Sequence, residues 1–249
     1  MSSKGIIVGC DKGQEWLLPW WWEYYTAHNS FPVAFADFGM SKKGIEWCLD
    51  KGDYLNIPTQ EILGDHEIPL RNKQIWEKLY GKETLKYRHA WFKKPLALLQ
   101  SPFSLNLWLD LDCQINGGLD PLFNSLTFGA EIGLVREPNF VQELLETQNA
   151  LLPGEIYYNS GVIVFRKGAD IVHRFAEEAF SNNAEHAGDQ HALCRAIFKH
   201  QPSLVELPLI YNWSRMLGTN PKAIIFHHTG GLGKVDILEV IRQRVSVKN

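Results

Sequence analysis

The sequence has few cysteines, no long apolar run and almost no excess of charge, and each shortage excludes a class of protein. The four cysteines are far apart and form no CxxC pair, which excludes a zinc ribbon and a dithiol redox motif. The formal net charge of -3 comes from interspersed acids and bases, which argues against a surface that binds nucleic acid. No apolar run approaches the length that spans a bilayer, so we expect no transmembrane segment.

What remains is typical of a soluble cytoplasmic protein with reduced thiols. The chain has 249 residues, 45% of them hydrophobic, and can form a substantial buried core without disulfide bonds. No repeat, linker or low-complexity segment divides it, so we predict one domain over residues 1–249. Arg242, Arg244 and Lys248 allow at most a peripheral membrane contact, although such a group is more typical of a solvated helix end. The oligomeric state is not indicated.

Short apolar runs alternate with helix-like runs along the chain. The predicted strands lie at residues 5–10, 31–39, 54–58, 105–115, 128–137 and 157–168 and in the runs LVELPLIYNW and AIIFHHTG. The predicted helices include residues 41–52, 84–103, 169–183 and 188–200, the first with a serine cap and a glycine stop. This alternation indicates an α/β fold in which helices flank a central, mainly parallel sheet. In such Rossmann-like folds, ligands bind beyond the carboxyl ends of the strands.

The run LNLWLDLDCQI, residues 105–115, repeats a carboxylate on one face of a predicted strand. With a period of two, Trp108, Asp110 and Asp112 share a face opposite the leucines. Two like charges at this spacing repel and lose hydration in a central strand, so the arrangement is costly unless a cation or several donors lie there. Carboxylate oxygens suit Mn²⁺ or Mg²⁺ better than zinc, so both aspartates are candidate metal ligands. A solvated strand end is the alternative.

A second motif, AIIFHHTGGLGKV, takes an apolar strand into two histidines, a glycine-rich turn and a lysine. Such a turn lets the backbone approach a phosphate, Lys234 adds positive charge, and His227 or His228 can complete a metal site begun by carboxylates. A capped strand followed by a flexible loop has the same composition. The P-loop pattern is not met, because Val235 stands where a serine or threonine would bind magnesium.

Two shorter motifs each have a simple structural explanation. The triplet Asn159, Ser160 and Gly161 precedes a predicted strand and is typical of a turn, although it can also present polar groups to a sugar-sized ligand. Asp189 and Gln190 begin a predicted helix, where an acid is favoured by the helix dipole alone. Neither motif indicates a function by itself.

The order of these motifs resembles that of the GT-A glycosyltransferases, most closely family 8, the glycogenin and lipooligosaccharide galactosyltransferase group. Asp-x-Asp comes first, followed by Asn-Ser-Gly, Asp-Gln and His-x-x-Gly with a nearby lysine, and the resemblance covers residues 6–234. It implies a nucleotide-diphospho-sugar transferase fold. It also implies a hexosyltransferase that moves a sugar from a nucleotide-diphosphate sugar to an acceptor with retention of configuration. Among such donors it favours a UDP-sugar.

The resemblance implies roles for single residues on the donor side. Asp110 and Asp112 resemble the pair that holds a manganese ion, or magnesium, against the two phosphates of the donor. Asp11, just past the first strand, resembles a contact to the nucleotide base. Lys93 and Lys94 lie about as far ahead of this pair as the basic residue that contacts the donor phosphate or sugar.

Further correspondences concern the reaction centre. Asn159, Asp189 and Gln190 resemble contacts to the donor sugar and the reacting groups, and Asp189 has a possible role in either an inverting or a retaining scheme.

The glycine-rich loop fits the family pattern in two registers. His228, Gly231 and Lys234 match the spacing His-x-x-Gly-x-x-Lys, whereas His227, three residues before Gly230, matches the local pattern of histidine, aromatic, threonine and glycine. Both histidines therefore stay candidate metal ligands. Both glycines and the lysine are candidate contacts to the diphosphate.

Two other classes of protein share this kind of sheet. A nucleotidyltransferase that forms nucleotide sugars predicts a glycine-rich loop with arginine and lysine after the first strand, which VGCDKGQEW does not supply. A non-catalytic nucleotide- or carbohydrate-binding protein is the other alternative. The donor sugar is not indicated, and neither is the acceptor, whether sugar, lipid or protein. We expect the acceptor to be bound by variable loops such as residues 59–81 or 151–155.

Overall fold

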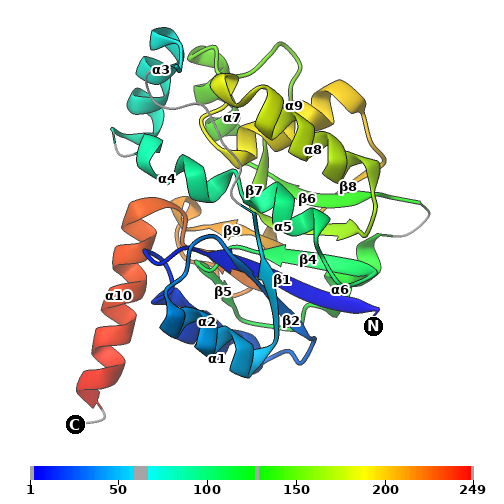
Figure 1. The fold of residues 1–249 in the computed structure, drawn as a ribbon. Coiled ribbons are helices and arrows are strands. Elements are labelled where there is room, and N and C mark those ends of the chain that lie inside the picture. Colours follow the sequence, from blue (N-terminus) through cyan, green and yellow to red (C-terminus); the bar gives the residue numbers. More distant parts are fainter. Residues whose placement is uncertain (1–2, 59–66, 83, 127–128, 248–249) are drawn as a thin grey trace.

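The main sheet contains seven strands, and the computed structural model describes residues 3–58, 67–82, 84–126 and 129–247 (Figure 1). In spatial order the strands are β3 (Asp53–Asn56), β2 (Val33–Asp37), β1 (Lys4–Cys10), β4 (Leu105–Leu109), β7 (Tyr158–Arg166), β6 (Ile132–Arg136) and β8 (Leu204–Glu206). Strand β7 runs antiparallel to its neighbours β4 and β6, and the other four pairings are parallel. The predicted α/β fold with a mainly parallel sheet is confirmed.

Helices cover both faces of this sheet. The α-helices of the described residues are α1 (Leu17–Thr26), α2 (Lys42–Lys51), α3 (Leu70–Tyr80), α4 (Thr84–Trp91), α5 (Lys94–Leu99), α6 (Asp120–Ser125), α7 (Asn139–Thr147), α8 (Asp170–Ser181), α9 (Asp189–His200) and α10 (Gly230–Val247). Helices α5, α8 and α9 pack on one face and α1, α2 and α6 on the other (Figure 1). The predicted helices at 41–52, 169–183 and 188–200 are confirmed as α2, α8 and α9, whereas 84–103 divides into α4 and α5.

The strand predicted over residues 105–115 is wrong in its length. Strand β4 ends at Leu109, and a turn closed by the Cys113 N–H and the Asp110 carbonyl (3.0 Å) redirects the chain. The next strand, β5 (Cys113–Ile115), belongs to a second sheet with β10 (Ile225–His227) and β9 (Trp213–Ser214). The alternation of the sequence continues through the turn because Leu111 and Cys113 contact the same core as the leucines of β4.

Strand β4 is buried on both faces, which fixes the position of the carboxylates that follow it. Leu107 and Leu109 are completely buried in the core on the α1 face, and Trp108 is 1% exposed in the core on the α5 face. Each such side chain stabilises the fold by about 1.5–3 kcal/mol through burial. The end of β4 is therefore a rigid support for Asp110.

The remaining predictions concern the edges of the molecule. Residues 70–80 of the predicted acceptor loop form α3, and residues 59–66 lie outside the described part of the chain. In the basic group near the C-terminus, the Arg244 guanidinium lies 2.8 Å from Glu23 and donates to the Tyr24 hydroxyl (2.7 Å), so α10 packs on α1, and Lys248 lies outside the described residues. Within the described residues, no helix combines the length and apolar character that crossing a membrane requires.

Candidate active site

Polar side chains from several elements meet where β4 ends. The antiparallel pairing of β4 and β7 places Leu109 opposite Val162, so the start of β7 lies beside the end of β4. Helices α5, α9 and α10 each begin near this point, and β10 ends there. The side chains brought together are Lys94, Asp110, Asp112, Asn159, Ser160, Asp189, Gln190, His227 and Lys234.

A buried lysine joins two of the predicted acidic residues. The Lys94 Nζ lies 3.0 Å from the Asp110 Oδ1 and 2.7 Å from the Asp189 Oδ2, and it also donates to the Ser160 carbonyl (3.1 Å). The Ser160 hydroxyl donates to the same Asp189 oxygen (2.8 Å). Burial would lower the pKa of Lys94, but the carboxylates of Asp110 and Asp189 outweigh it and raise the pKa. Lys94 therefore stays charged and ties β4 to α9.

The two neighbouring lysines point to different places. The Lys93 Nζ donates to the carbonyl of Phe38, just beyond β2 (3.0 Å). Asp11 lies in the turn between β1 and α1, where its Oδ1 accepts from the Gln14 N–H (3.1 Å). The structure thus places Lys94 between Asp110 and Asp189. The ammonium group of Lys93 lies beyond the end of β2, and Asp11 lies beyond the end of β1.

Asp112 has two cationic or polar partners from the C-terminal part of the chain. Its Oδ1 lies 3.2 Å from the His227 Nε2, and its Oδ2 lies 3.1 Å from the Lys234 Nζ. The side chain is only 11% exposed. Burial would raise the pKa of Asp112, but Lys234 and His227 outweigh it and hold the pKa well below its ordinary value. Asp112 is therefore ionised.

A chain of hydrogen bonds fixes which ring nitrogen of His227 carries a proton. The Asn159 Oδ1 accepts from the Gly161 N–H (2.8 Å) and from the Asn212 Nδ2 (2.7 Å), and the Asn159 Nδ2 donates to the Glu137 carboxylate (2.6 Å). The Asn212 Oδ1 then faces the His227 Nδ1 at 2.8 Å. Because an N–H only donates and a carboxylate only accepts, both amides have one orientation, and the His227 Nδ1 is the donor.

When His227 is neutral, its Nε2 therefore carries a lone pair that faces the Asp112 carboxylate. Two acceptors at 3.2 Å repel unless a proton or a metal cation lies between them. Burial would lower the pKa of His227, but the Asp112 carboxylate outweighs it and raises the pKa, so the site attracts positive charge. A histidine whose other nitrogen donates to a side-chain oxygen is also the usual form of a metal ligand.

The balance of charge in the site also favours the binding of a cation. The site contains four carboxylates, those of Asp110, Asp112, Glu137 and Asp189, but only two ammonium groups, those of Lys94 and Lys234. The Asp110 side chain is 29% exposed, so one wall of the site opens to solvent. The Asp112 carboxylate and the His227 imidazole lie close together and are donor types that fit a divalent cation.

The other histidine, His228, points away from Asp112. Its Nε2 lies 3.1 Å from the Gln114 Oε1, and its ring packs edge-on against Trp20 at 5.7 Å between centroids. Successive residues at a strand end face opposite sides, which separates the two rings. The structure therefore brings His227 to the aspartate and leaves His228 in an aromatic environment.

The glycine-rich turn forms the start of α10. Gly230 has a φ of +77°, a conformation that favours glycine, and Gly231 follows in the first turn. The first backbone N–H groups of a helix have no partner within the helix and carry partial positive charge. Lys234 extends from the next turn to Asp112, so this helix start belongs to the site.

Glu137 and Asn212 are part of the site but were not among the predicted residues. Glu137 follows β6 and also accepts from the Gln190 Nε2 (3.0 Å), while the Gln190 Oε1 accepts from the Ser160 N–H (3.3 Å). Both residues lie at the carboxyl ends of runs with strand-like sequence, at the edge where ligands bind. That placement was the available signal, although a single polar residue at a strand end is common.

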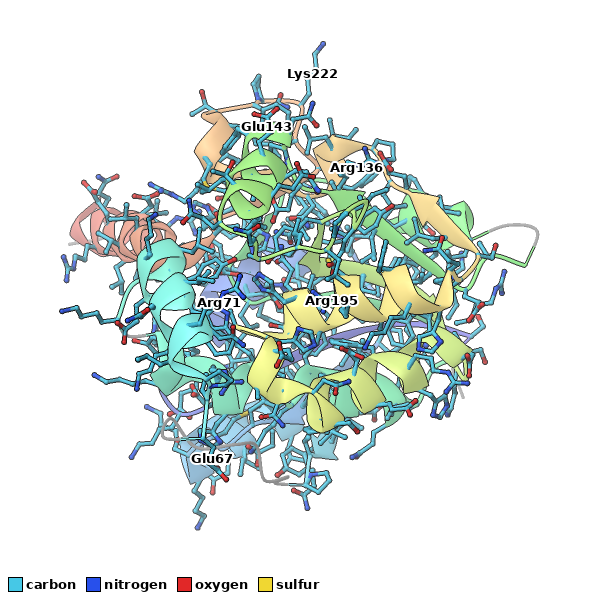
Figure 2. All side chains as sticks on the ribbon, turned by 90° about the horizontal axis from the view of Figure 1, so that it is seen from above. Glu67, Arg71, Arg136, Glu143, Arg195 and Lys222 are labelled. Carbon is cyan, nitrogen blue, oxygen red and sulfur yellow. The ribbon has the colours of Figure 1, made fainter. Side chains whose placement is uncertain are left out.

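A groove of about 460 Å³ opens beside Glu137. It lies between the end of β6 and residues 206–209, and its lining includes Pro138, Leu207 and Leu209. Arg136, labelled in Figure 2, spans its rim through an ion pair with Glu206 (3.3 Å). Since Glu137 contacts both Asn159 and Gln190, the groove adjoins the carboxylate cluster.

Comparison with known proteins gives the fold a name. No protein-family model and no curated protein sequence matches this chain. The solved structure of the galactosyltransferase LgtC, in complex with donor and acceptor sugar analogues, matches with a TM-score of 0.60 and 15% identity, over 90% of this chain and 86% of that one. This chain has the GT-A fold.

Two further GT-A glycosyltransferases resemble it. Mouse xyloside xylosyltransferase 1 matches with a TM-score of 0.53 and 14% identity, over 90% of this chain and 96% of that one. The glycosyltransferase GlyE of Streptococcus pneumoniae matches with a TM-score of 0.58 and 13% identity, over 94% of this chain and 59% of that one. The resemblance of fold that the motif order implied is thus confirmed, and at these identities the likeness is one of fold.

Proposed function

We propose that this protein is a metal-dependent glycosyltransferase that moves a sugar from a nucleotide-diphosphate sugar to an acceptor. The donor that we favour is a UDP-sugar. The observation that carries the proposal is the meeting of Asp112, His227 and Lys234 beside Asp110 at the ligand-binding edge of a GT-A sheet. Three solved structures of similar fold are glycosyltransferases, one of them solved with donor and acceptor sugar analogues. Retention of configuration follows from the resemblance to family 8.

Asp110, Asp112 and His227 would hold the cation, Mn²⁺ or Mg²⁺. When bound, such a cation neutralises the negative charge that develops on the leaving diphosphate. The protein holds these ligands ready, because β4 fixes Asp110 and the amides of Asn159 and Asn212 fix the ring of His227.

The start of α10 would bind the diphosphate. The free N–H groups of Gly230 and Gly231 and the positive end of the helix form a site for an anion. Burial would lower the pKa of Lys234, but Asp112 outweighs it and raises the pKa, so the ammonium group stays charged beside the phosphates. Such donors stabilise the transition state more than the ground state, because the charge on the leaving group grows as the bond lengthens.

The residues at the start of α9 would lie at the donor sugar. Both lone-pair directions of the Asp189 Oδ2 are occupied by Lys94 and Ser160, so we assign Asp189 to holding Lys94 rather than to deprotonating an acceptor. Gln190 is partly exposed, and beside its bonds to Glu137 and Ser160 its amide keeps one N–H and one lone pair, which it would offer to the sugar. LgtC has also been solved as an active-site variant in which a glutamine is replaced by glutamate.

Three other residues complete the proposed donor site. The amide of Asn159 is occupied by protein groups, so we assign it to positioning His227 rather than to contacting the sugar. Asp11 at the end of β1 and Lys93 at the end of β2 remain proposed contacts to the nucleotide.

Loss of the Asn212 amide should weaken metal binding. In Asn212→Ala the His227 Nδ1 loses its acceptor, so the ring is free to turn or to change its protonated nitrogen. We expect the affinity for Mn²⁺, measured by the electron paramagnetic resonance of free Mn²⁺, to fall by about 10–100-fold. Asn116→Ala is the matched control, because Asn116 donates to the carbonyl of Ala223 and lies outside this chain of bonds. Equal affinities in the two variants would remove Asn212 from the site.

The groove beside Glu137 would receive the acceptor. It is lined by Glu137, which bonds to Gln190 and Asn159, and it lies on the side of β7 away from β1. Leu209→Trp should fill it without touching the aspartates. We expect this variant to keep the stabilisation that UDP and Mn²⁺ give the parent, but to lose transfer to every acceptor that a glycan array identifies. An acceptor transferred equally well by parent and variant would place the acceptor site elsewhere.

One assay separates the proposed function from its alternatives. The protein is incubated with UDP-glucose, UDP-galactose and other nucleotide sugars in the presence of Mn²⁺, and the products are separated. A retaining glycosyltransferase releases UDP and transfers the sugar to an acceptor hydroxyl, or to water where no acceptor is present, with the anomeric configuration of the donor. A nucleotidyltransferase given pyrophosphate instead forms UTP and a sugar 1-phosphate. A non-catalytic binder forms neither, and absence of UDP release from every donor would overturn the proposal.

A further inference from the structure

A cysteine lies in the proposed cation site without a role in it. The Cys113 Sγ, one carboxylate oxygen of Asp112 and one ring nitrogen of His227 all lie within 4.8 Å of one another. The three residues are 0%, 8% and 4% exposed. The donors proposed for Mn²⁺ are oxygens and one nitrogen, so a thiol at this distance changes which metals the site accepts.

The fold holds this thiol against His227. Cys113 begins β5 and stands directly opposite His227 in the antiparallel pairing of β5 with β10. Side chains of such a cross-strand pair share one face, with Cβ atoms about 4.5–5.5 Å apart. Gly161 packs behind both. Its carbonyl oxygen lies 3.7 Å from the Sγ, and a Cβ on it would clash with the His227 Cε1.

The chemistry of the three donors favours a softer metal than manganese. Thiolate and imidazole select Zn²⁺ and Co²⁺, whereas Mn²⁺ and Mg²⁺ prefer oxygen ligands. Catalytic zinc sites commonly have three protein ligands and one open position. Donor atoms around one zinc ion lie roughly 3–4 Å apart, given Zn–S near 2.3 Å and Zn–N near 2.0 Å. The donor atoms, now within 4.8 Å of one another, would therefore need to shift by only about 1 Å to reach this spacing.

We propose that Asp112, Cys113 and His227 form a second coordination mode that binds a thiophilic divalent cation such as Zn²⁺. Binding forms a metal–sulfur bond and releases the thiol proton to solvent, with no change of oxidation state. This mode uses Asp112 and His227, which are also ligands of the proposed Mn²⁺ site, so the two metals compete. The inhibition of sugar transfer by Zn²⁺ that follows rests on the proposed function, whereas the binding itself does not.

Cobalt gives a direct view of the sulfur. Co²⁺ is added to the metal-free protein, and the near-ultraviolet sulfur-to-cobalt charge-transfer band is recorded. We expect the band in the parent and in Cys194→Ser, and no band in Cys113→Ser. Cys194→Ser is the matched control, because the Cys194 Sγ is also buried but donates to the carbonyl of Tyr158. A parent without the band, or a band that persists in Cys113→Ser, overturns the proposal.

If Cys113→Ser does not fold, the parent protein alone still tests whether the Cys113 sulfur binds zinc. X-ray absorption at the zinc edge should show one sulfur at about 2.3 Å, and a shell of only oxygen and nitrogen would contradict the assignment. Where Cys113→Ser folds, the Zn²⁺ concentration that displaces bound Mn²⁺ should rise by about tenfold or more.

These readouts separate this proposal from the proposed function. If UDP fails to bind with Mn²⁺ but the cobalt band is present, the donor site fails and the thiol site stands. If UDP binds with Mn²⁺ and the band is absent, the thiol site fails alone.

Discussion

Asp112→Asn is expected to lower the release of UDP from a UDP-sugar by about 10³-fold, with Mn²⁺ present. The substitution keeps the size of the side chain but removes the charge that faces His227 and Lys234. Loss of this charge costs the cation a ligand and leaves the developing charge on the diphosphate less stabilised. Removal of one preorganised electrostatic donor commonly costs about 10²–10³ in rate, which is about 3–4 kcal/mol of transition-state stabilisation.

The matched control for this variant is Asp120→Asn. Asp120 is an exposed acid in the first turn of α6, so its loss changes the net charge equally without touching the site. We expect its turnover to match that of the parent. Circular dichroism of both variants checks that they fold. Unchanged turnover in a folded Asp112→Asn protein would remove the aspartate pair from the mechanism.

Lys94→Met is expected to give the largest loss of stability of any single change at the site. The ammonium group is buried between Asp110 and Asp189, and its removal leaves two carboxylates that repel with no cation between them. Breaking a buried ion pair in this way costs about 3–5 kcal/mol. For a chain of this size the melting temperature should fall by roughly 6–20 °C, as differential scanning calorimetry would record.

The adjacent lysine provides the control for Lys94. Lys93→Met removes one hydrogen bond to the carbonyl of Phe38, so the free energy of unfolding should fall by only about 1 kcal/mol. The double variant Lys94→Met with Asp189→Asn should recover part of the loss, because one unpaired carboxylate is then neutral. If Lys94→Met and Lys93→Met melted at the same temperature, Lys94 would not hold the network together.

The sequence predicted the fold and the elements that carry the site, but not where β4 ends. The alternation of LNLWLDLDC continues past Leu109 because Leu111 and Cys113 pack into the same core as the residues before the turn. A periodic pattern reports which side chains face a core. It does not report that the backbone between them has left one sheet for another.

The partners of the aspartates could be predicted less well, because they come from distant parts of the chain. Asp112 meets His227 and Lys234, which lie more than a hundred residues later, and only the resemblance of motif order connected them. The choice between His227 and His228 depends on which face of β10 meets Asp112, and strand alternation alone does not give that face. The roles of Glu137 and Asn212 depend on amide orientations, which exist only in the folded structure.

The most direct measurement of the account's central claim is a calorimetric titration of UDP into the metal-free protein, repeated with Mn²⁺ and with Mg²⁺. A cation held by Asp110, Asp112 and His227 against the diphosphate predicts that UDP binds at least about tenfold more tightly with metal than without, a difference of about 1.4 kcal/mol. The same titration of Asp112→Asn should show no dependence on metal. Equal affinities of the parent for UDP with and without metal, or no binding under either condition, would contradict the account.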